Sequence, residues 1–424
     1  MSHLFALGPF HSRSFRFQLP ADLCTAWALE METLILGWYV LVQTGSVFML
    51  TVFGALQYGG TLATPLLGTL GDRLGLRRVL SVMRLTYALL AAVIFLLAVT
   101  GRLNAVAVLV MAGLASLIRT SDIGMRSALI GATVPAQHFV PAMGISRTTS
   151  DSAKIVGALV GASVFATFGM ASAYAAITLI HLLGAALTLQ VDAGRLYRAE
   201  PEATRQSPWH ELKEGLLYAW RTPQLLAAMS VAALVNLTAF PLTVGLMPYI
   251  ARDVFLLDQR GLGWLVASFA SGALIGSLVM SVWGSRLRPA RAMLATCVVW
   301  HLCLFGFVLT QNLHSVKLAM LTLLAAGAAQ SMGMLALSII LLRTSDERFR
   351  GRIMGVRMLA IYPLPVGLLI AGGLIPHLGF ALTAQGLLAS GLLLLAAIAL
   401  RWRQDLLWRD AKGNALTTSK KSAA

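Results

Sequence analysis

Charged residues are scarce in this chain, and their scarcity excludes an ordinary soluble domain. Only 12% of the 424 residues are charged, and 58% are hydrophobic. Soluble domains carry about 25% charged residues and about 45–50% apolar ones. The mean hydropathy is +0.77. Because a membrane-spanning helix needs about 20 apolar residues in a row, the composition predicts a protein that crosses the lipid bilayer many times.

Cysteines and enzyme motifs are also sparse. The cysteines lie in apolar stretches without a C-x-x-C pair, which excludes a disulfide framework or a zinc site: Cys24, Cys297 and Cys303. The chain lacks the G-x-x-x-x-G-K-[ST] loop that binds ATP phosphates. Residues 210–214 read H-E-L-K-E and lack the second histidine of the zinc-protease motif. We therefore expect no cofactor, no metal ion and no enzymatic activity.

Acidic residues are fewer than basic ones, 17 against 33, which gives a net charge of +16. In a soluble protein this balance indicates nucleic-acid binding. Here the bases lie in short segments between apolar runs, so we expect no nucleic-acid partner. Cytoplasmic loops retain Arg and Lys, and the bias predicts a bacterial inner-membrane protein with both termini in the cytoplasm. The inner segments then hold Arg73, Arg77, Arg78, Arg286, Arg288, Arg291, Arg343, Arg348, Arg350 and Arg352, and the outer loops hold Arg102, Arg252, Arg260 and Lys317.

Apolar windows predict an all-α membrane protein of twelve transmembrane helices in two six-helix halves. The predicted spans are 21–43, 47–70, 79–100, 104–126, 141–168, 172–191, 225–250, 262–283, 292–310, 317–342, 353–376 and 380–400. The predicted parts are a cytoplasmic segment (1–20), an N-terminal half (21–191), a cytoplasmic loop (192–222), a C-terminal half (223–401) and a cytoplasmic tail (402–424). Prolines are tolerated within spans and mark kinks, here at Pro65, Pro241, Pro363 and Pro365.

The two halves repeat each other. G-D-R-L at 71–74 corresponds to G-S-R-L at 284–287, and M-G-I-S-R at 143–147 corresponds to M-G-V-R at 354–357. The second copy follows the first after about 210 residues in both cases. Two six-span halves of the same topology form a parallel repeat, which is known from one large transporter architecture.

The loop after the second span carries a family resemblance. Residues 68–78 read G-T-L-G-D-R-L-G-L-R-R, which resembles the signature G-x-L-a-D-R-x-G-R-[RK]-[RK] of the major facilitator superfamily. The match covers Gly68, Asp72, Arg73, Gly75, Arg77 and Arg78, and it departs at Leu76, where Arg is usual. The resemblance implies a secondary transporter in which this loop is a latch between the halves.

The region from Arg126 to Arg147 resembles the siderophore and macrolide exporter branch of that family. The fifth span departs from the exporter pattern G-x-x-x-G-P-x-x-G-G, because Ala158 stands for the proline and Ala162 for the second glycine. The resemblance also implies that spans five and eight face each other. Both spans carry a G-x-x-x-G pattern, which permits close helix packing: Gly157 and Gly161 in span five, Gly272 and Gly276 in span eight.

Ionisable residues inside spans are costly, about 2.5–3.5 kcal/mol each, and most of them lie in the first half. Span four has Arg119, Asp122 and Arg126, and span five has Arg147, Asp151 and Lys154. These spacings put each trio on one helical face that must look inward. Pairs such as Arg119–Asp122 and Arg147–Asp151 fit either a structural latch or the handling of substrate and protons.

Glu30 and Glu32 lie near the middle of span one and point about 200° apart. Glu30 shares a face with Trp27, Thr33 and Gly37, which we interpret as cavity wall, whereas Glu32 needs a basic or hydroxyl partner from another helix. A carboxylate in a partly dry cavity can bind and release protons near neutral pH. The proton-coupling candidates are Glu30, Glu32, Asp122 and Asp151.

The second half offers mainly uncharged inward candidates. The substrate-cavity candidates of the whole chain are Trp27, Tyr39, Arg119, Asn236, Gln330 and Tyr362. His301 in span nine fits a packed histidine better than a functional one. We expect a monomeric secondary transporter whose partners are the bilayer, a small-molecule substrate and protons, and most directly a proton-coupled exporter of small organic molecules. The alternatives are a proton-coupled importer of a small metabolite, a polytopic membrane enzyme, and a receptor or scaffold derived from a transporter.

Overall fold

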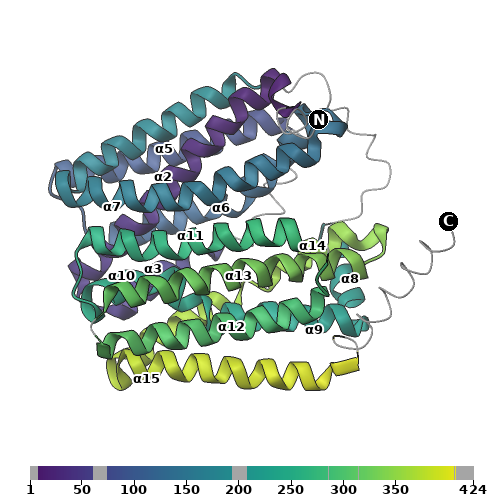
Figure 1. Ribbon diagram of the computed structural model, residues 1–424. Helices are drawn as coiled ribbons and strands as arrows, with labels where there is room; N and C mark the ends of the chain where they lie inside the picture. The colour runs from purple at the N-terminus through teal and green to yellow at the C-terminus, as the bar shows by residue number, and fades with distance from the viewer. Residues whose placement is uncertain are drawn as a thin grey trace. The chain divides into compact units, whose positions relative to one another are not determined.

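The computed structural model describes residues 8–60, 74–192, 208–284, 286–313, 315–404 and 406. Within these residues the chain forms helices and no strand (Figure 1). The main helices are α2 (Arg13–Thr44), α3 (Val47–Leu56), α5 (Leu76–Val99), α6 (Ala105–Thr133), α7 (Ala136–Leu189), α8 (Pro208–Arg221), α9 (Pro223–Thr238), α11 (Gln259–Trp283), α12 (Pro289–Leu309), α13 (Val316–Thr344), α14 (Arg350–Leu359) and α15 (Pro363–Arg401). Shorter helical turns occupy Gly8–His11, Pro241–Gly245, Met247–Tyr249, Ile250–Val254, Thr310–Leu313 and Glu347–Phe349.

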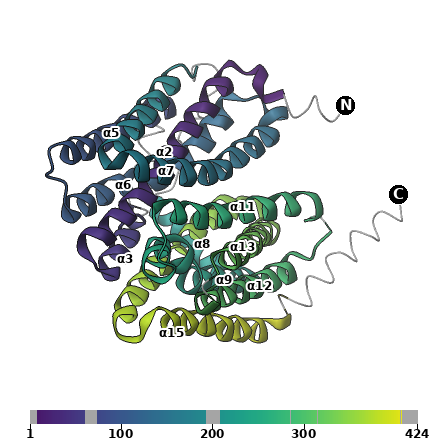
Figure 2. The same ribbon diagram turned by 60° about the vertical axis from the view of Figure 1, so that its left-hand side comes forward.

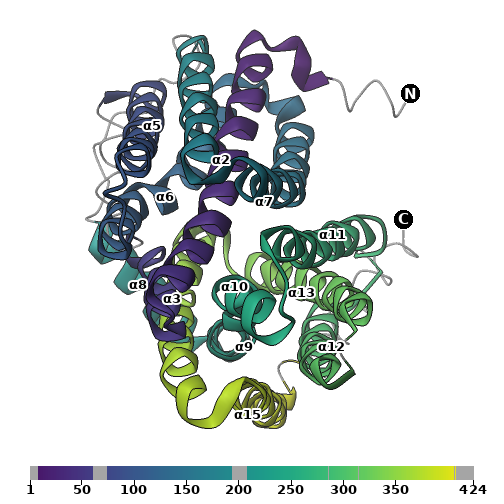
Figure 3. The same cartoon turned by 90° about the vertical axis from the view of Figure 1, so that its left-hand side faces the viewer.

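The chain divides into two compact units. Unit 1 comprises Met1–Arg205 and Pro248–Ala267, and unit 2 comprises Gln206–Met247 and Ser268–Ala424. In unit 1, α2 and α5 both pack along α7, and α6 contacts α2 and α5 (Figure 3). In unit 2, α12 packs against α13, and α15 packs against α9 and α12 (Figure 2). Each unit therefore has its own packed set of helices.

Eight helices of the described residues are long and apolar enough to cross a membrane, and two shorter apolar helices, α3 and α9, accompany them. Large apolar side chains remain exposed on them, such as Leu89, Leu179 and Leu393. Apolar surface of this kind is stable against lipid tails and costly in water.

Two of the eight stretches contain a break in the helical backbone. Gly169 inside α7 has φ 77° and ψ −175°, and Gly379 inside α15 has φ 77° and ψ 166°. Only glycine adopts this backbone region without strain. The breaks fall in the gaps predicted between spans five and six and between spans eleven and twelve, and α15 changes direction along its course (Figure 3).

Proline interrupts two predicted spans, as expected. α9 ends at Thr238 and a π-helical turn begins at Pro241, and α14 ends at Leu359 before α15 begins at Pro363. Proline removes a backbone N–H donor and crowds the preceding turn. Pro365 lies within the first turn of α15, and Pro65 lies outside the described residues.

The segment predicted as a polar loop, 192–222, contains a helix that the sequence analysis missed. α8 carries apolar residues on one side and charged ones on the other, and its Glu214 pairs with Arg352 at the start of α14. The mixed composition hid this helix from a search for continuous apolar runs, because its period is that of an amphipathic helix.

Candidate functional site

Unit 1 has an open cavity whose wall is rich in charge. Helix α2 contributes Glu30, while α6 and α7 contribute the two trios predicted from spacing. The charged lining residues are Glu30, Arg119, Asp122, Arg126, Arg147, Asp151 and Lys154, and Ser146 and Ser150 add hydroxyls. The structure thus brings together seven of the ionisable residues that the sequence placed on inward faces.

Asp151 forms the centre of one intrahelical cluster in this wall. Its carboxylate accepts a hydrogen bond from Arg147 Nε at 3.0 Å and pairs with Lys154 Nζ at 3.4 Å. The side chains of Arg147 and Lys154 are 67% and 45% exposed. The Asp151 side chain between them is only 7% exposed, so the cluster holds a buried acid beside two solvent-exposed bases at the cavity rim.

The predicted pair between Arg119 and Asp122 is wrong. Asp122 instead pairs with Arg126, one turn further along α6. An acid that precedes a base by four residues meets it on the helix surface, and this order is also the favoured one. Arg119 is thereby left to partners on other helices.

Arg119 crosses to α2 and to the end of α3. Its guanidinium donates to Thr33 Oγ1 at 3.1 Å and to Gln57 Oε1. The Thr33 hydroxyl lies 3.3 Å from Gln57 Oε1 and donates to Leu29 O. Sequence reasoning missed Gln57, although an amide at the end of a ten-residue apolar helix is a signal of an inward polar contact.

A second, smaller cavity lies in the same unit. Its lining is mostly aliphatic, and its polar members are Glu32, Thr33, Gln57, Tyr87, Ser116 and Arg119. Glu30 lines the larger cavity and Glu32 the smaller one, as their opposite directions on α2 require. Leu29 and Arg119 line both cavities.

Glu32 has the cross-helix partner that its position demanded. His181 of α7 places Nε2 at 3.7 Å from Glu32 Oε1. The His181 ring is fully buried and stacks on Tyr87 of α5, with ring centroids 5.4 Å apart. His181 was not among the residues predicted from the sequence, although an ionisable residue inside an apolar run is a signal of function.

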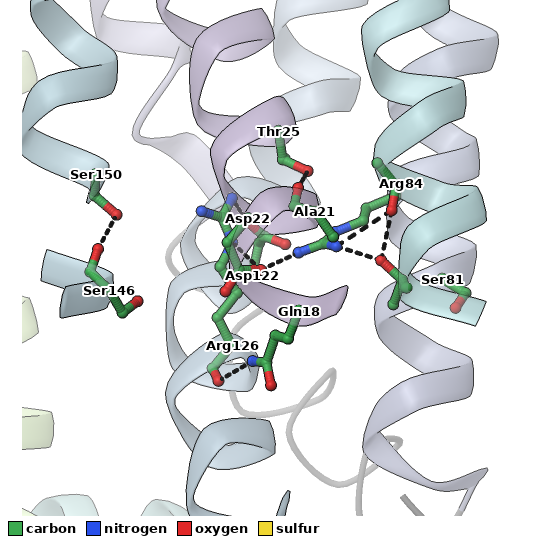
Figure 4. A network of polar contacts seen from close by, with 12 residues as sticks. Gln18, Ala21, Asp22, Thr25, Ser81, Arg84, Asp122, Arg126, Ser146 and Ser150 are labelled. Atoms are coloured by element: carbon green, nitrogen blue, oxygen red, sulfur yellow. Dashed lines mark hydrogen bonds and ion pairs between the residues drawn. The ribbon is translucent and has the colours of Figure 1, made fainter. Parts of the chain in front are cut away.

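A buried ion-pair network joins α2, α5 and α6 (Figure 4). Asp22 pairs with Arg84, and Arg126 lies 3.9 Å from Asp22 while pairing with Asp122. Two acids and two bases therefore balance within the core. Gln18 Nε2 donates to the Arg126 carbonyl at 2.9 Å, and Arg84 also donates to Thr188 at the end of α7. Arg84 was not among the residues predicted from the sequence, although an arginine inside a membrane span is itself a signal of a paired or functional site.

Several sequence-predicted residues lie outside both cavities. The Tyr39 hydroxyl donates to Leu103 O at 2.9 Å, and the Asn236 amide donates to Ala232 O on its own helix. Gln330 is half-buried on α13, and Tyr362 lies in the turn before α15. The Trp27 indole is buried with its N–H unpartnered among the described residues. His301 is packed as expected, bonded to Cys297 O and Thr238 Oγ1.

The four packing glycines all approach other helices closely. Gly157 and Gly161 face α2 at Glu30 and Met31, and Gly272 and Gly276 face the α13 backbone at Leu324 and Ala328. Another glycine of α11, Gly263, meets α7, where an added Cβ would lie 3.0 Å from Ala158 O and 2.7 Å from Ala162 Cβ. A G-x-x-x-G pattern permits close approach but does not choose the partner.

The signature loop lies partly outside the described residues, which exclude Gly68, Asp72 and Arg73. Gly75 precedes α5 with φ 90°, Arg77 donates to Val191 O at 3.1 Å, and Arg78 is exposed. The described part of the loop therefore ties the start of α5 to the chain just after α7.

Apolar helices of membrane-spanning length that enclose charged cavities define a multi-pass membrane transport protein. Residues 23–258 match the Major Facilitator Superfamily, and the chain belongs to this family. It is a membrane transporter and not an enzyme.

Named relatives agree with this class. The chain is 28% identical over 386 residues to the "Multidrug efflux pump Tap" of Mycolicibacterium fortuitum. The aligned region covers 85% of this chain and 89% of that protein. It is similar in fold to a bacterial homologue of the human lysosomal transporter Spinster, with TM-score 0.70, 13% identity, and coverage of 94% of this chain and 99% of that one. A D-xylose–proton symporter gives TM-score 0.68 at 13% identity, with coverage of 91% and 97%.

Proposed function

We propose that this protein exports small organic molecules by alternating access and that an inward proton gradient drives the export. The observation that carries the proposal is the charged cavity of unit 1, where Glu30 faces Arg119 and the α6 and α7 acids. The similarity to a multidrug efflux pump over 85% of the chain supports export as the direction. Because the chain lacks an ATP-binding loop, a gradient is the energy source that fits.

The coupling step assigns a role to each of two residues. Deprotonated Glu30 attracts Arg119 across the cavity, and protonation removes that attraction. Arg119 then stays with Gln57 and Thr33, the partners that it has in this structure. A substrate that interacts with Arg119 or Glu30 is thus held or released according to the proton on Glu30.

In this proposal, the protein has twelve membrane spans in two halves, and both termini lie in the cytoplasm of a bacterial cell. The long stretches 136–189 and 350–401 each contain a glycine break that divides them into two spans, and α3 and α9 supply two shorter ones. Together with the remaining six long helices they support the count of twelve. The halves rock about the bound substrate as parallel repeats do.

The test is transport of ethidium, a fluorescent organic cation, by the purified protein in liposomes. We expect an imposed pH gradient to move ethidium in the direction opposite to the protons, and collapse of the gradient with an ionophore to stop it. Movement of ethidium together with protons would favour the importer instead. A protein that carries out no exchange with any of a panel of organic cations, anions and neutral drugs would contradict transport of small organic molecules.

A further inference from the structure

His181 is a buried histidine, and its surroundings do not satisfy the hydrogen-bonding capacity of its ring nitrogens. Its side chain is 0% exposed, and neither Nδ1 nor Nε2 has a hydrogen-bond partner among the described residues. A buried polar group left in this way costs about 1–3 kcal/mol, and such exceptions in a folded protein call for an explanation.

Burial alone does not leave a histidine unpartnered in this chain. His301 of unit 2 is equally buried, yet Nδ1 lies 2.8 Å from Cys297 O and Nε2 lies 3.0 Å from Thr238 Oγ1. His181 instead has the carboxylate of Glu32 at 3.7 Å and the ring of Tyr87 stacked on its face. His181 therefore has a charged carboxylate nearby, where His301 has uncharged hydrogen-bond partners.

Glu32 connects this histidine to the smaller cavity. The Glu32 side chain is 14% exposed and lines that cavity together with Tyr87, so water in the cavity has access to the carboxylate. The groups that face the pair are Glu32 from α2, Tyr87 from α5 and Tyr174 from α7. From α6, the charges of Arg119, Asp122 and Arg126 act on Tyr87.

We infer that Glu32 and His181 form a proton-binding pair, distinct from Glu30 in the larger cavity. A proton from cavity water bonds to the carboxylate and is shared with Nε2 of His181, and it leaves by the same route. With the proton, the two groups become a hydrogen-bonded pair, and without it the imidazole is neutral beside a carboxylate. Histidine is suited to this role because its charge changes between about pH 5 and about pH 8.

This inference rests on the proposed proton coupling and extends it. Arg119 lines both cavities, so a proton on either glutamate alters the charge that Arg119 faces. The larger cavity then holds one coupling carboxylate and the smaller one holds the Glu32–His181 pair. The pair acts on the substrate through Arg119, and His181 is a positioning residue in this sense.

The experiment needs no substrate. Purified protein in detergent is acidified from about pH 8 to about pH 5, and the protons it takes up are counted with a pH-indicator dye. We expect His181→Gln to take up about one proton fewer than the wild-type protein, because the imidazole that shares the proton of the pair is lost. His301→Gln is the matched control, and we expect its proton uptake to equal that of the wild type.

A second variant tests the carboxylate. Glu32→Gln keeps the histidine but removes the carboxylate that shares the proton with it, and we expect its proton-uptake curve to differ from that of the wild type. If His181→Gln does not elute as a monodisperse protein, the uptake curve of Glu32→Gln alone tests the Glu32–His181 pair. An uptake curve of monodisperse His181→Gln that equals the wild-type curve would overturn the pair. If the histidine variant fails to fold, an unchanged curve of Glu32→Gln would overturn it.

The result is independent of ethidium transport. If the wild-type protein moves no organic ion under a pH gradient but His181→Gln still loses a proton, the proposed function fails and the pair stands. If transport is driven by protons and the uptake curves do not differ, the pair fails and the proposed function stands.

Discussion

At the residue scale, unit 1 contains two kinds of ionisable group. Asp22, Arg84, Asp122 and Arg126 form buried pairs that neutralise one another in the core. Glu30 forms no ion pair or hydrogen bond with another described residue and faces the larger cavity. A buried charge in an ion pair is compensated by its partner, whereas the Glu30 carboxylate is open to whatever enters the larger cavity.

The first prediction concerns Glu30. In Glu30→Gln, we expect pH-gradient-driven ethidium movement to fall at least about tenfold, which corresponds to about 1.4 kcal/mol, while counterflow exchange stays near the wild-type rate. The reason is that the glutamine cannot exchange a proton but keeps the size of the cavity wall. Proteoliposome assays of both modes measure the difference, and Glu30→Asp is the control. Full gradient-driven transport by Glu30→Gln would remove this residue from the coupling step.

The second prediction concerns Arg84. We expect Arg84→Leu to destabilise the protein by about 3–5 kcal/mol, because it leaves two buried carboxylates, Asp22 and Asp122, with Arg126 as their one remaining counter-charge in the network. The double variant Asp22→Leu/Arg84→Leu should recover much of this loss, since no unpaired charge remains.

Thermal unfolding in detergent measures both effects. Arg147→Gln is the control, because it removes a base that is 67% exposed and leaves Lys154 beside Asp151. A single Arg84→Leu variant that unfolds at the wild-type temperature would show that the buried pair does not matter for stability.

At the scale of the elements, the sequence predicted the long helices well and their contacts poorly. Apolar length located the spans, and an i to i+4 pair such as Arg147–Asp151 is readable because both members lie on one helix. The contacts Asp22–Arg84 and Glu32–His181 join residues that are 62 and 149 positions apart. Which helix neighbours which is a property of tertiary packing, so these partners could not be chosen from periodicity alone.

The third prediction concerns the glycine breaks. In Gly169→Ala and Gly379→Ala, we expect a loss of about 1–3 kcal/mol each, because alanine is strained in this backbone region even where there is space for its Cβ. Space is present at both positions.

Gly113→Ala is the control, since Gly113 lies within α6 with open space around it and alanine favours a helix. Melting temperatures of the three variants in detergent make the comparison. Equal stability of all three would mean that the breaks do not depend on glycine.

At the scale of the whole molecule, the distribution of arginine predicts how the chain is oriented in the membrane. Arginines follow every second predicted span, and only four bases lie in the predicted outer loops. Positive residues near the ends of spans remain on the cytoplasmic side during insertion. The bias therefore predicts that both termini lie in the cytoplasm.

The fourth prediction tests this topology with reporter fusions. We expect fusions after Arg205 and after Lys412 to report the cytoplasm and fusions near Arg102 and Arg260 to report the outside. Alkaline phosphatase, which is active only outside, and a fluorescent protein that folds only inside give opposite readings at each site. An external reading at Arg205 would contradict the arrangement of six spans on each side of it.

The matching breaks at Gly169 and Gly379 bear on the history of the chain. They lie 210 positions apart, which is the spacing of the sequence repeat, and both have φ 77°. A conformation open only to glycine is kept only as long as the residue is glycine. If the two halves descend from one half-length gene, that ancestor already turned at this glycine, and duplication copied the turn together with the helices on either side. The turn at this glycine is then older than the pairing of the halves, and older than the charged cavity that unit 1 carries.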